Sequence, residues 1–390
     1  MSAVKCDILI TGAGLAGLSL LYRAMKSGIW KTEKIIIVDK SDKSGNDKTW
    51  SFWKTVPTDF EDIIHHQWKD LVFYSNDGKK IPLKNGGYTY NSIKSIDFYL
   101  HIISALQHYP NISFVQDDII DISSSAGECK LITPSATYLS KYLFNSIYIK
   151  PQLLKGEQYF LQHFKGIRIK TDQSAIPVTE AYLMDFRTGQ EHGTTFFYTL
   201  PMAKDELFIE YTLFSASLLP LAEYDRQIRI YLTEILKIDV YEILEEEFGF
   251  IPMTDHQFKR FEGNIIHIGT AGGDTRASTG YTFTNTQKTI DKIINSVQSN
   301  GHPFFETENI GVKAQLYDSA LLLVLAKRKY EGYQLFYDLF SKTSACRIFA
   351  FLDAETSVFE DMHIMKSLRV FPFLQSFTAA VYRRLFPSKM

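Results

Sequence analysis

The sequence has few cysteines, almost no net charge and no long apolar run. Its three cysteines, Cys6, Cys129 and Cys346, are scattered and form no CxxC pair, which argues against a disulfide framework or a thiolate metal site. Lys+Arg 42 against Asp+Glu 44 leaves a net charge of −2, so no overall field attracts nucleic acid. The longest apolar stretch, Ala320 to Ala326, is far too short to span a bilayer.

Two further absences concern the N-terminus and metal ligands. Asp7 interrupts the first apolar run, so a signal peptide is not expected and the protein is predicted to be cytoplasmic. The one histidine doublet, His65-His66, has no HExxH motif or carboxylate partner at metal spacing. A solvated helix is therefore expected there, and no metal site is predicted.

A glycine motif near the N-terminus has the full context of a dinucleotide site. The strand Cys6 to Thr11 leads directly into Gly12-Ala13-Gly14-Leu15-Ala16-Gly17, and a helical pattern follows and stops at Ser27-Gly28. A second apolar strand, Lys34 to Asp39, ends in an acid that is expected to accept hydrogen bonds from the adenosine ribose, with Lys40 beside it in the predicted site. The helix N-terminus offers free N–H groups to the phosphates. These residues alone leave NAD and FAD both open.

A carboxylate stands in the middle of a strongly apolar strand. Leu207 to Phe214 contains no Gly or Pro and is rich in β-branched and aromatic residues, which predicts a strand paired with Thr195 to Leu200. Alternation places Phe208, Glu210 and Thr212 on one face. Neither face is polar, so burial is expected to keep Glu210 protonated and make it a proton donor. The alternative is a Glu at a strand end, paired with a Lys or Arg.

A second strand, glycine-rich loop and helix follow late in the chain. The strand Ile265 to Gly269 leads into Thr270-Ala271-Gly272-Gly273, then Gly280-Tyr281, and a helix is expected over Thr284 to Ser299. In flavoproteins such a helix start lies near the pyrimidine end of the flavin, where its dipole favours negative charge on the reduced ring. This favours FAD over NAD, with Gly269, Thr270, Gly272, Gly273, Gly280 and Tyr281 as further cofactor residues. A purely structural glycine turn is the alternative.

Two other segments carry charge patterns. Asp185 and Arg187 fall on one face if Met184 to Arg187 is extended, either as catalytic groups or as an ordinary ion pair. The tail from Lys366 to Met390 carries Lys366, Arg369, Arg383, Arg384 and Lys389 without an acid, interleaved with aromatic residues. That composition suits contact with a membrane surface, or a helix docked on the body of the protein.

The length of 390 residues and the two separated glycine loops predict interleaved domains in an α/β fold with α+β insertions. A Rossmann-type FAD-binding domain is expected from residues 1–75, 96–150 and 255–300. A substrate domain with an antiparallel sheet is expected from residues 76–95 and 151–254. Residues 301–390 are expected to form a helical C-terminal region, and no oligomeric state is predicted.

Taken together, these segments resemble the flavin-dependent lycopene β-cyclases of bacteria and plants. The resemblance rests on the first glycine motif, Thr49-Trp50-Ser51-Phe52, Leu183 to Arg187, Phe208 to Thr212, Ile251-Pro252-Met253 and Gly269 to Gly273 with Thr279-Gly280-Tyr281. The family segment is commonly Phe-Leu-Glu-Glu-Thr, whose first Glu matches Glu210 and whose second is replaced here by Tyr211. Related flavin hydroxylases usually have Gly-Asp where this chain has Gly269-Thr270.

The resemblance implies an acid-catalysed cyclisation of the acyclic ψ-ends of lycopene to β-ionone rings. It implies Glu210 as the acid with Asp185 and Arg187 in the catalytic site, reduced FAD as cofactor and NAD(P)H as reductant, without net redox change. The water-insoluble substrate implies peripheral association with the inner face of the membrane. Two alternatives are a redox flavoenzyme, such as a monooxygenase or prenyl reductase with an apolar substrate, and a carotenoid- or lipid-binding protein with an idle flavin fold.

Overall fold

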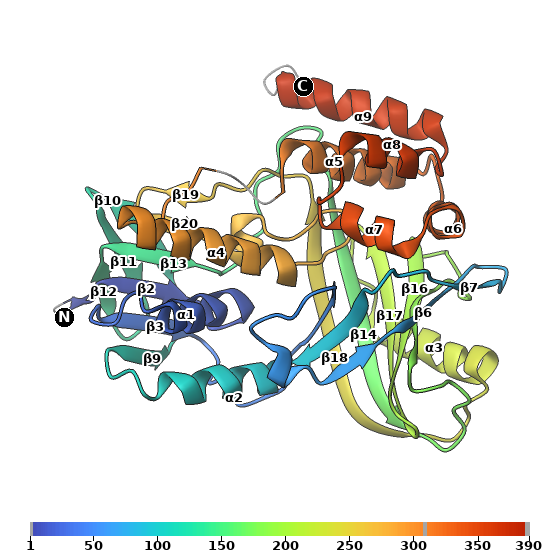
Figure 1. Cartoon of the computed structure of the whole chain (residues 1–390), viewed down its shortest axis with the longest axis horizontal. Coiled ribbons are helices and arrows are strands. Elements are labelled where there is room, and N and C mark those ends of the chain that lie inside the picture. The colour runs from blue at the N-terminus through green and yellow to red at the C-terminus, as the bar shows by residue number, and fades with distance from the viewer. Residues whose placement is uncertain (1–2, 307–309, 387–390) are drawn as a thin grey trace.

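A computed structural model of the chain describes residues 3–306 and 310–386. Figure 1 shows three parts: a parallel sheet with its helices at the left, a sheet of long strands at the right, and a group of helices above them. The predicted Lys389 lies outside the described residues. No helix in the described part of the chain combines the length and the hydropathy needed to cross a bilayer.

The parallel sheet is the Rossmann-type unit that the first glycine motif predicted. Its six strands are ordered β19-β20-β13-β2-β3-β9, and all neighbouring pairs are parallel except β19 with β20. Their bounds are β2 Ile8–Thr11, β3 Ile35–Asp39, β9 Ile112–Gln116, β13 Tyr142–Asn145, β19 Phe261–Glu262 and β20 Ile265–His267. Strands β2 and β3 are buried along their whole length, which explains their continuous apolar sequence.

Helices cover one face of this sheet and a smaller sheet covers the other. The helices are α1 Leu15–Ser27, α2 Ser95–Leu106 and α4 Phe283–Asn300, and α1 ends at Gly28 with φ 80° as the sequence predicted. The smaller sheet, in the order β1-β12-β11-β10, consists of β1 Val4–Lys5, β12 Thr137–Ser140, β11 Glu128–Ile132 and β10 Asp121–Ser125. Leu9, Val38 and Leu131 share the apolar core between the two sheets.

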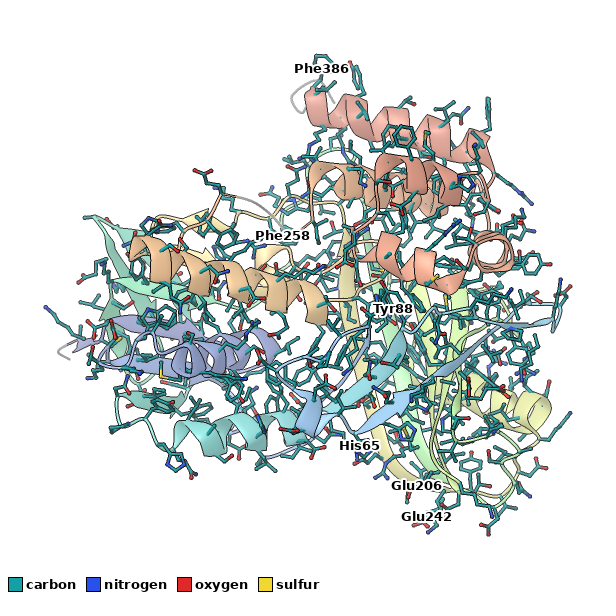
Figure 2. All side chains as sticks on the ribbon, viewed as in Figure 1. His65, Tyr88, Glu206, Glu242, Phe258 and Phe386 are labelled. Atoms are coloured by element: carbon teal, nitrogen blue, oxygen red, sulfur yellow. The ribbon has the colours of Figure 1, made fainter. Side chains whose placement is uncertain are left out.

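The long-stranded sheet carries Glu210. Its order is β18-β14-β17-β16-β15-β6-β7, and every neighbouring pair is antiparallel except β15 with β6. The bounds are β6 Asp70–Tyr74, β7 Lys80–Pro82, β14 Tyr159–Lys170, β15 Glu180–Asp185, β16 Thr194–Ala203, β17 Glu206–Ser215 and β18 Glu242–Thr254. Figure 2 shows Glu206 and Glu242 together at one end of this sheet, and Phe258 beyond the other end, where the chain returns to the parallel sheet.

The two faces of the long sheet have different neighbours. Helix α3, Leu221–Ile230, which continues as a π-helical turn over Tyr231–Leu236, packs on Ile209 and Tyr211. The other face meets the C-terminal helices, as Phe196 and Phe214 share a core with Leu339 and Phe340. These helices are α5 Val312–Ala326, α6 Gly332–Lys342, α7 Ala345–Leu352, α8 Val358–Met365 and α9 Val370–Leu385. The C-terminal region is therefore helical, as predicted.

Two expectations from the sequence are corrected here. The predicted domain boundary at residue 75 falls one strand too late, because β6 forms a hairpin with β7 and joins the long sheet beside β15. The helix expected around His65-His66 is wrong as well. A short 3₁₀ turn, η1 (Glu61–Ile63), precedes it, and His66 opens β5 (His66–Trp68), whose backbone groups pair with β8 (Thr89–Lys94) in a three-stranded sheet with β4 (Thr49–Lys54).

Candidate active site

One cavity of about 400 Å³ brings together both glycine segments and the strand that carries Glu210. Of the residues predicted from the sequence, those that line it are Gly12, Gly14, Leu15, Ala16, Asp39, Gly269, Thr270, Gly280, Tyr281 and Glu210. Ala13, Gly17, Lys40, Gly272 and Gly273 do not line it. Segments separated by some 250 residues of chain thus meet at one site, as the predicted return to the first domain requires.

The first glycine motif has the geometry of a phosphate-binding turn. A Cβ on Gly17 would lie 2.0 Å from the Gly12 carbonyl oxygen, so only glycine permits this approach of α1 to the turn. Gly14 faces open space, with no atom within 4 Å of an added Cβ. The Ala13 N–H donates to Asp39 Oδ2 at 2.7 Å, which ties the turn to the end of β3. Lys40 is exposed, and the lysines that line the cavity are Lys48 and Lys43, the latter 3.1 Å from Asp39.

The second glycine segment is held by an acid that the sequence analysis did not single out. The short turn η3, Gly269–Gly272, donates its Gly269 N–H to Asp274 Oδ2 at 2.7 Å. Asp274 also accepts from Thr289 at 2.6 Å and from Arg260 at 2.8 Å. Burial raises the pKa of Asp274, and these donors favour its ionised form. In the sequence, Asp274 is recognisable only as an acid that follows Gly272-Gly273. A search for Gly-Asp directly after the strand misses it, because Gly269 is followed by Thr270.

The N-terminus of α4 points into the cavity and completes a site that fits a flavin dinucleotide. Thr282, Phe283 and Thr286 from this helix start line the wall. Gln162 Oε1 and Thr286 Oγ1 are buried there without a hydrogen-bond partner among the described residues. Buried polar groups normally have partners, so these atoms are suited to bind a polar ligand. The open face of Gly14 and the positive end of the α4 dipole suit the phosphates and an anionic ring.

Glu210 enters the same cavity from the middle of β17. It pairs with Gly166 of β14 on one side and Tyr198 of β16 on the other, and Phe208 and Thr212 share its face as alternation predicted. Thr212 Oγ1 donates to Glu210 Oε1 at 2.6 Å. The side chain is half-buried because it lines the cavity. Desolvation raises the pKa of Glu210, the carboxylate of Glu247 raises it further, and the Thr212 hydrogen bond lowers it.

A second, apolar cavity of about 680 Å³ lies between the long sheet and the C-terminal helices. It shares Tyr198, Thr279 and Tyr281 with the first cavity, so the two meet at these side chains. The Tyr90 and Tyr281 hydroxyls are 3.2 Å apart, and the Tyr90 ring stacks on Tyr198 with centroids 6.5 Å apart. The Trp53 ring centroid lies 4.2 Å from that of Tyr281 on the apolar side. The wall between the cavities is therefore aromatic.

The structure does not bring Asp185 and Arg187 together with Glu210. Asp185 is fully buried and pairs with Phe197 on the face of the sheet that packs against α3. Arg187 Nε lies 2.9 Å from Asp185 Oδ1, and the Tyr231 hydroxyl donates to Asp185 Oδ2 at 2.7 Å. The guanidinium of Arg187 lies over the Tyr74 ring, 3.7 Å from its centroid. The pair is thus the ordinary ion pair that the sequence left open, while Leu183 and Met184 of the same segment line the apolar cavity.

Several residues of the site were missed in the sequence. They are Glu247, Tyr90, Tyr198 and Gln162, all of which line the first cavity. None stands in a motif with a fixed spacing to Glu210, because each comes from a different strand. A weak signal existed for Glu247, which lies five residues before Pro252 in the segment that carries Ile251-Pro252-Met253.

Comparison with known proteins gives a family and a fold. Residues 7–378 match the protein family described as lycopene cyclase protein. The neoxanthin synthase of tomato chloroplasts (Solanum lycopersicum) is 26% identical over 295 residues, 70% of this chain and 57% of that protein. The capsanthin/capsorubin synthase of Capsicum annuum chromoplasts is 28% identical over 308 residues, 72% of this chain and 58% of that protein. The chain thus spans somewhat more than half the length of these curated relatives.

Solved structures share the fold at low identity. A geranylgeranyl bacteriochlorophyll reductase-like protein from Thermoplasma acidophilum superposes with a TM-score of 0.60 at 11% identity, covering 96% of this chain and 99% of that one. A flavoprotein/dehydrogenase from Cytophaga hutchinsonii gives 0.61 at 12% identity, covering 98% and 100%. HpxO from Klebsiella pneumoniae, solved with FAD, gives 0.58 at 12% identity, covering 90% and 98%. The chain therefore shares the fold of these three proteins.

Proposed function

The chain belongs to the lycopene cyclase family, and we propose that it is a lycopene β-cyclase that uses reduced FAD, with NAD(P)H as the reductant and no net redox change. The observation that carries this proposal is the position of Glu210. Its carboxyl group lines the cavity of both glycine segments, next to the aromatic wall behind which the apolar cavity lies. A proton donor, a dinucleotide site and a space for a polyene therefore adjoin one another.

Glu210 is the acid in this mechanism. Desolvation keeps its carboxyl group protonated at neutral pH, so the O–H proton is available to the terminal double bond of an acyclic ψ-end. The O–H bond breaks, a C–H bond forms, and a tertiary carbocation results. The neighbouring alkene attacks this cation and closes the ring. Loss of a ring proton to the Glu210 carboxylate leaves the β-ionone double bond and restores the acid, so atoms and electrons balance.

The wall of the cavity protects and stabilises the cation. Tyr90, Tyr198 and Tyr281 offer aromatic faces at the junction of the two cavities, and such faces attract a cation by about 0.5–2 kcal/mol each. Burial raises the pKa of all three phenols, so they stay neutral. The apolar surroundings keep water away from a cation that it would quench. When bound, reduced FAD would supply a negative charge beside the cation, in the field of the α4 N-terminus.

The apolar cavity accounts for the long polyene and for its source. Met362, Val370 and Leu374 of α8 and α9 line this cavity and are also exposed, so the cavity opens between these helices. Phe359 and Phe371 are 80% and 71% exposed on the same two helices, which lie at the outer surface (Figure 1). Apolar side chains at the mouth of an apolar cavity support uptake of lycopene directly from a bilayer, with the protein at the inner face of the membrane.

The basic residues of the tail contribute unequally to this surface. Lys366 and Arg369 are exposed beside the cavity mouth and are suited to anionic headgroups. Arg383 instead forms an ion pair with Asp255, whose side chain is only 1% exposed, and Arg384 Nη1 donates to Gln315 at 2.7 Å. The last turn of α9 is therefore attached to the body of the protein, while the exposed residues before its first turn support the proposed membrane contact.

Replacement of Glu210 by Gln tests the proposal. Glu210→Gln keeps the shape of the side chain and removes the acid, so lycopene cyclisation with reduced FAD should fall by at least about a hundredfold. Glu206→Gln is the matched control, because Glu206 lies on the same strand and face but pairs with Arg168 at 2.8 Å outside the first cavity. Flavin content of both variants is measured by absorbance, and β-carotene and γ-carotene are measured by chromatography.

Three results would contradict the proposal. Near-normal turnover of Glu210→Gln removes the acid from the mechanism. NAD(P)H consumption stoichiometric with product indicates a redox flavoenzyme, whereas the cyclase needs only catalytic reduction. A wild-type protein that binds lycopene and flavin but yields no cyclic product is a binding protein.

A further inference from the structure

A glycine separates two carboxylates on one face of the long sheet. Gly166 of β14 lies opposite Glu210 of β17 on one side and opposite Glu247 of β18 on the other. Directly opposed residues of a sheet point their side chains to the same face. With strands about 4.8 Å apart, the two glutamates stand roughly 10 Å apart at their Cα atoms, and the residue between them in the row has no side chain of its own.

The space above Gly166 is already occupied by its neighbours. A Cβ on Gly166 would lie 2.5 Å from Phe208 Cζ and 3.1 Å from Glu247 Cγ. Any side chain here would displace the groups that surround the two carboxylates. Because Gly166 has no side chain, the side chains of Phe208 and Glu247 can occupy the space above it, beside Glu210.

The two carboxylates share the first cavity but have different surroundings. Glu247 Oε2 accepts from Thr49 Oγ1 at 2.9 Å, and Lys48 favours its negative charge. Glu247 also lines a small side cavity of about 110 Å³, which Glu210 does not reach. That side cavity contains the charged or titratable groups His65, Lys94, Arg168, Glu245 and Glu246. Glu210, in contrast, faces Phe208, Leu200 and Tyr198.

The different surroundings of Glu210 and Glu247 determine which of the two carboxyl groups carries the negative charge. Burial raises the pKa of both glutamates, and Glu245 raises that of Glu247 further, but the Thr49 hydrogen bond and Lys48 lower the pKa of Glu247, whereas no cation in the described part of the chain acts on Glu210. Two like charges in one site resist ionising together, so the proton stays on the partner with the more apolar surroundings. The other titratable groups that line the cavity with the two glutamates are the phenols of Tyr90, Tyr99, Tyr198 and Tyr281, whose pKa values burial raises, and the charged groups Asp39, Lys43, Asp47 and Lys48.

We propose that Glu247 is the positioning residue of the acid: its negative charge, held across Gly166, keeps the proton on Glu210 between turnovers. The inference rests on the proposed role of Glu210. The second carboxylate that the family segment carries next to the acid is Tyr211 here, and Tyr211 lies on the opposite face against α3. A carboxylate from another strand takes the place beside the acid instead.

Glu247→Gln tests this inference through the pH profile of cyclisation. The acid must be protonated to work, so activity is lost as the pH rises through the pKa of Glu210. Without the neighbouring charge this alkaline limb should move to lower pH by about one unit, which is a roughly tenfold loss at a fixed pH on the limb. At pH values well below the limb, activity should match the wild type. A merely structural role would lower activity equally at every pH.

Matched variants separate charge from packing. Glu247→Asp keeps the charge and should keep the limb near its wild-type position. Glu246→Gln removes the same charge one residue away; Glu246 pairs with Ile167 on the α3 face of the sheet, where its carboxylate lies 2.8 Å from Lys165, so the profile should stay unchanged. If Glu247→Gln does not retain flavin, Glu247→Asn supplies the uncharged variant. An unshifted limb in the uncharged variant overturns the inference alone, whereas absence of cyclisation in the wild type overturns the proposed function.

Discussion

Adding one methyl group at Gly166 should disturb both the stability and the activity of the protein. In Gly166→Ala the new Cβ would lie 2.5 Å from Phe208 Cζ, where carbon atoms prefer about 3.5–4.0 Å. The Phe208 ring must therefore move by about 1 Å or more. Because Phe208 lines both the first cavity and the side cavity, the ring moves within the walls of the site itself.

The size of the effect follows from two opposing contributions. Overpacking of a filled site costs about 1–3 kcal/mol. Replacing glycine in a strand regains about 0.5–1 kcal/mol, because alanine loses less conformational freedom on folding. We expect a net loss of about 1–2 kcal/mol in the free energy of unfolding. A shift of about 1 Å near reacting groups should lower kcat by about ten- to a hundredfold.

Thermal unfolding of the flavin-loaded protein, followed by fluorescence, and steady-state cyclisation measure these two effects. Gly45→Ala is the control, since an added Cβ at this loop residue meets no atom within 4 Å. It should leave both stability and kcat unchanged or slightly raise stability. If Gly166→Ala is as stable and as active as Gly45→Ala, the packing around the carboxylate pair is not as described.

Two other predictions concern the far face of the sheet and the C-terminal helices. Arg187→Ala should destabilise the fold by about 3–5 kcal/mol, because it leaves the buried carboxylate of Asp185 without its cation. The kcat per folded molecule should stay at the wild-type value. A loss of kcat without a loss of stability would mean that Arg187 acts in the active site. Phe359→Ser with Phe371→Ser should reduce sedimentation with anionic liposomes by about tenfold. The control Leu100→Ser with Val240→Ser, at two apolar residues that are 61% and 71% exposed elsewhere, should not reduce it. Equal losses in both pairs would remove α8 and α9 as the docking face.

The parts of the fold that the sequence predicted are those determined locally. The run from Leu207 to Phe214 contains no breaking residue, so its strand and the face of Glu210 followed from alternation alone. The turn at Gly12 and the end of α1 at Gly28 have positive φ angles, which restrict these positions to glycine. Such features leave a direct trace in the order of residue types.

The parts that were missed depend on pairing between distant strands. The residues around Glu247 do not indicate that β18 lies two strands from β17, because the strand order results from the packing of the whole sheet. Asp185 and Arg187 form an ion pair, but the sequence did not determine which face of the sheet they occupy. The insertion of β6 beside β15 and the bulge between these strands determine which side of β15 packs on α3. Alternation gives two faces and does not say which one borders the active site.

The parallel pairing of β13 with β20 also bears on how the molecule is made. Leu143 lies beside Ile265, and the strands β14 to β18 are synthesised between them. Contacts between such distant segments form slowly, and a chain leaving the ribosome folds from its N-terminus onward. The glycine turn of α1 thus exists early, but its sheet gains its last parallel strand only after most of the long sheet has emerged. We therefore expect the proposed flavin site to be completed late in biogenesis.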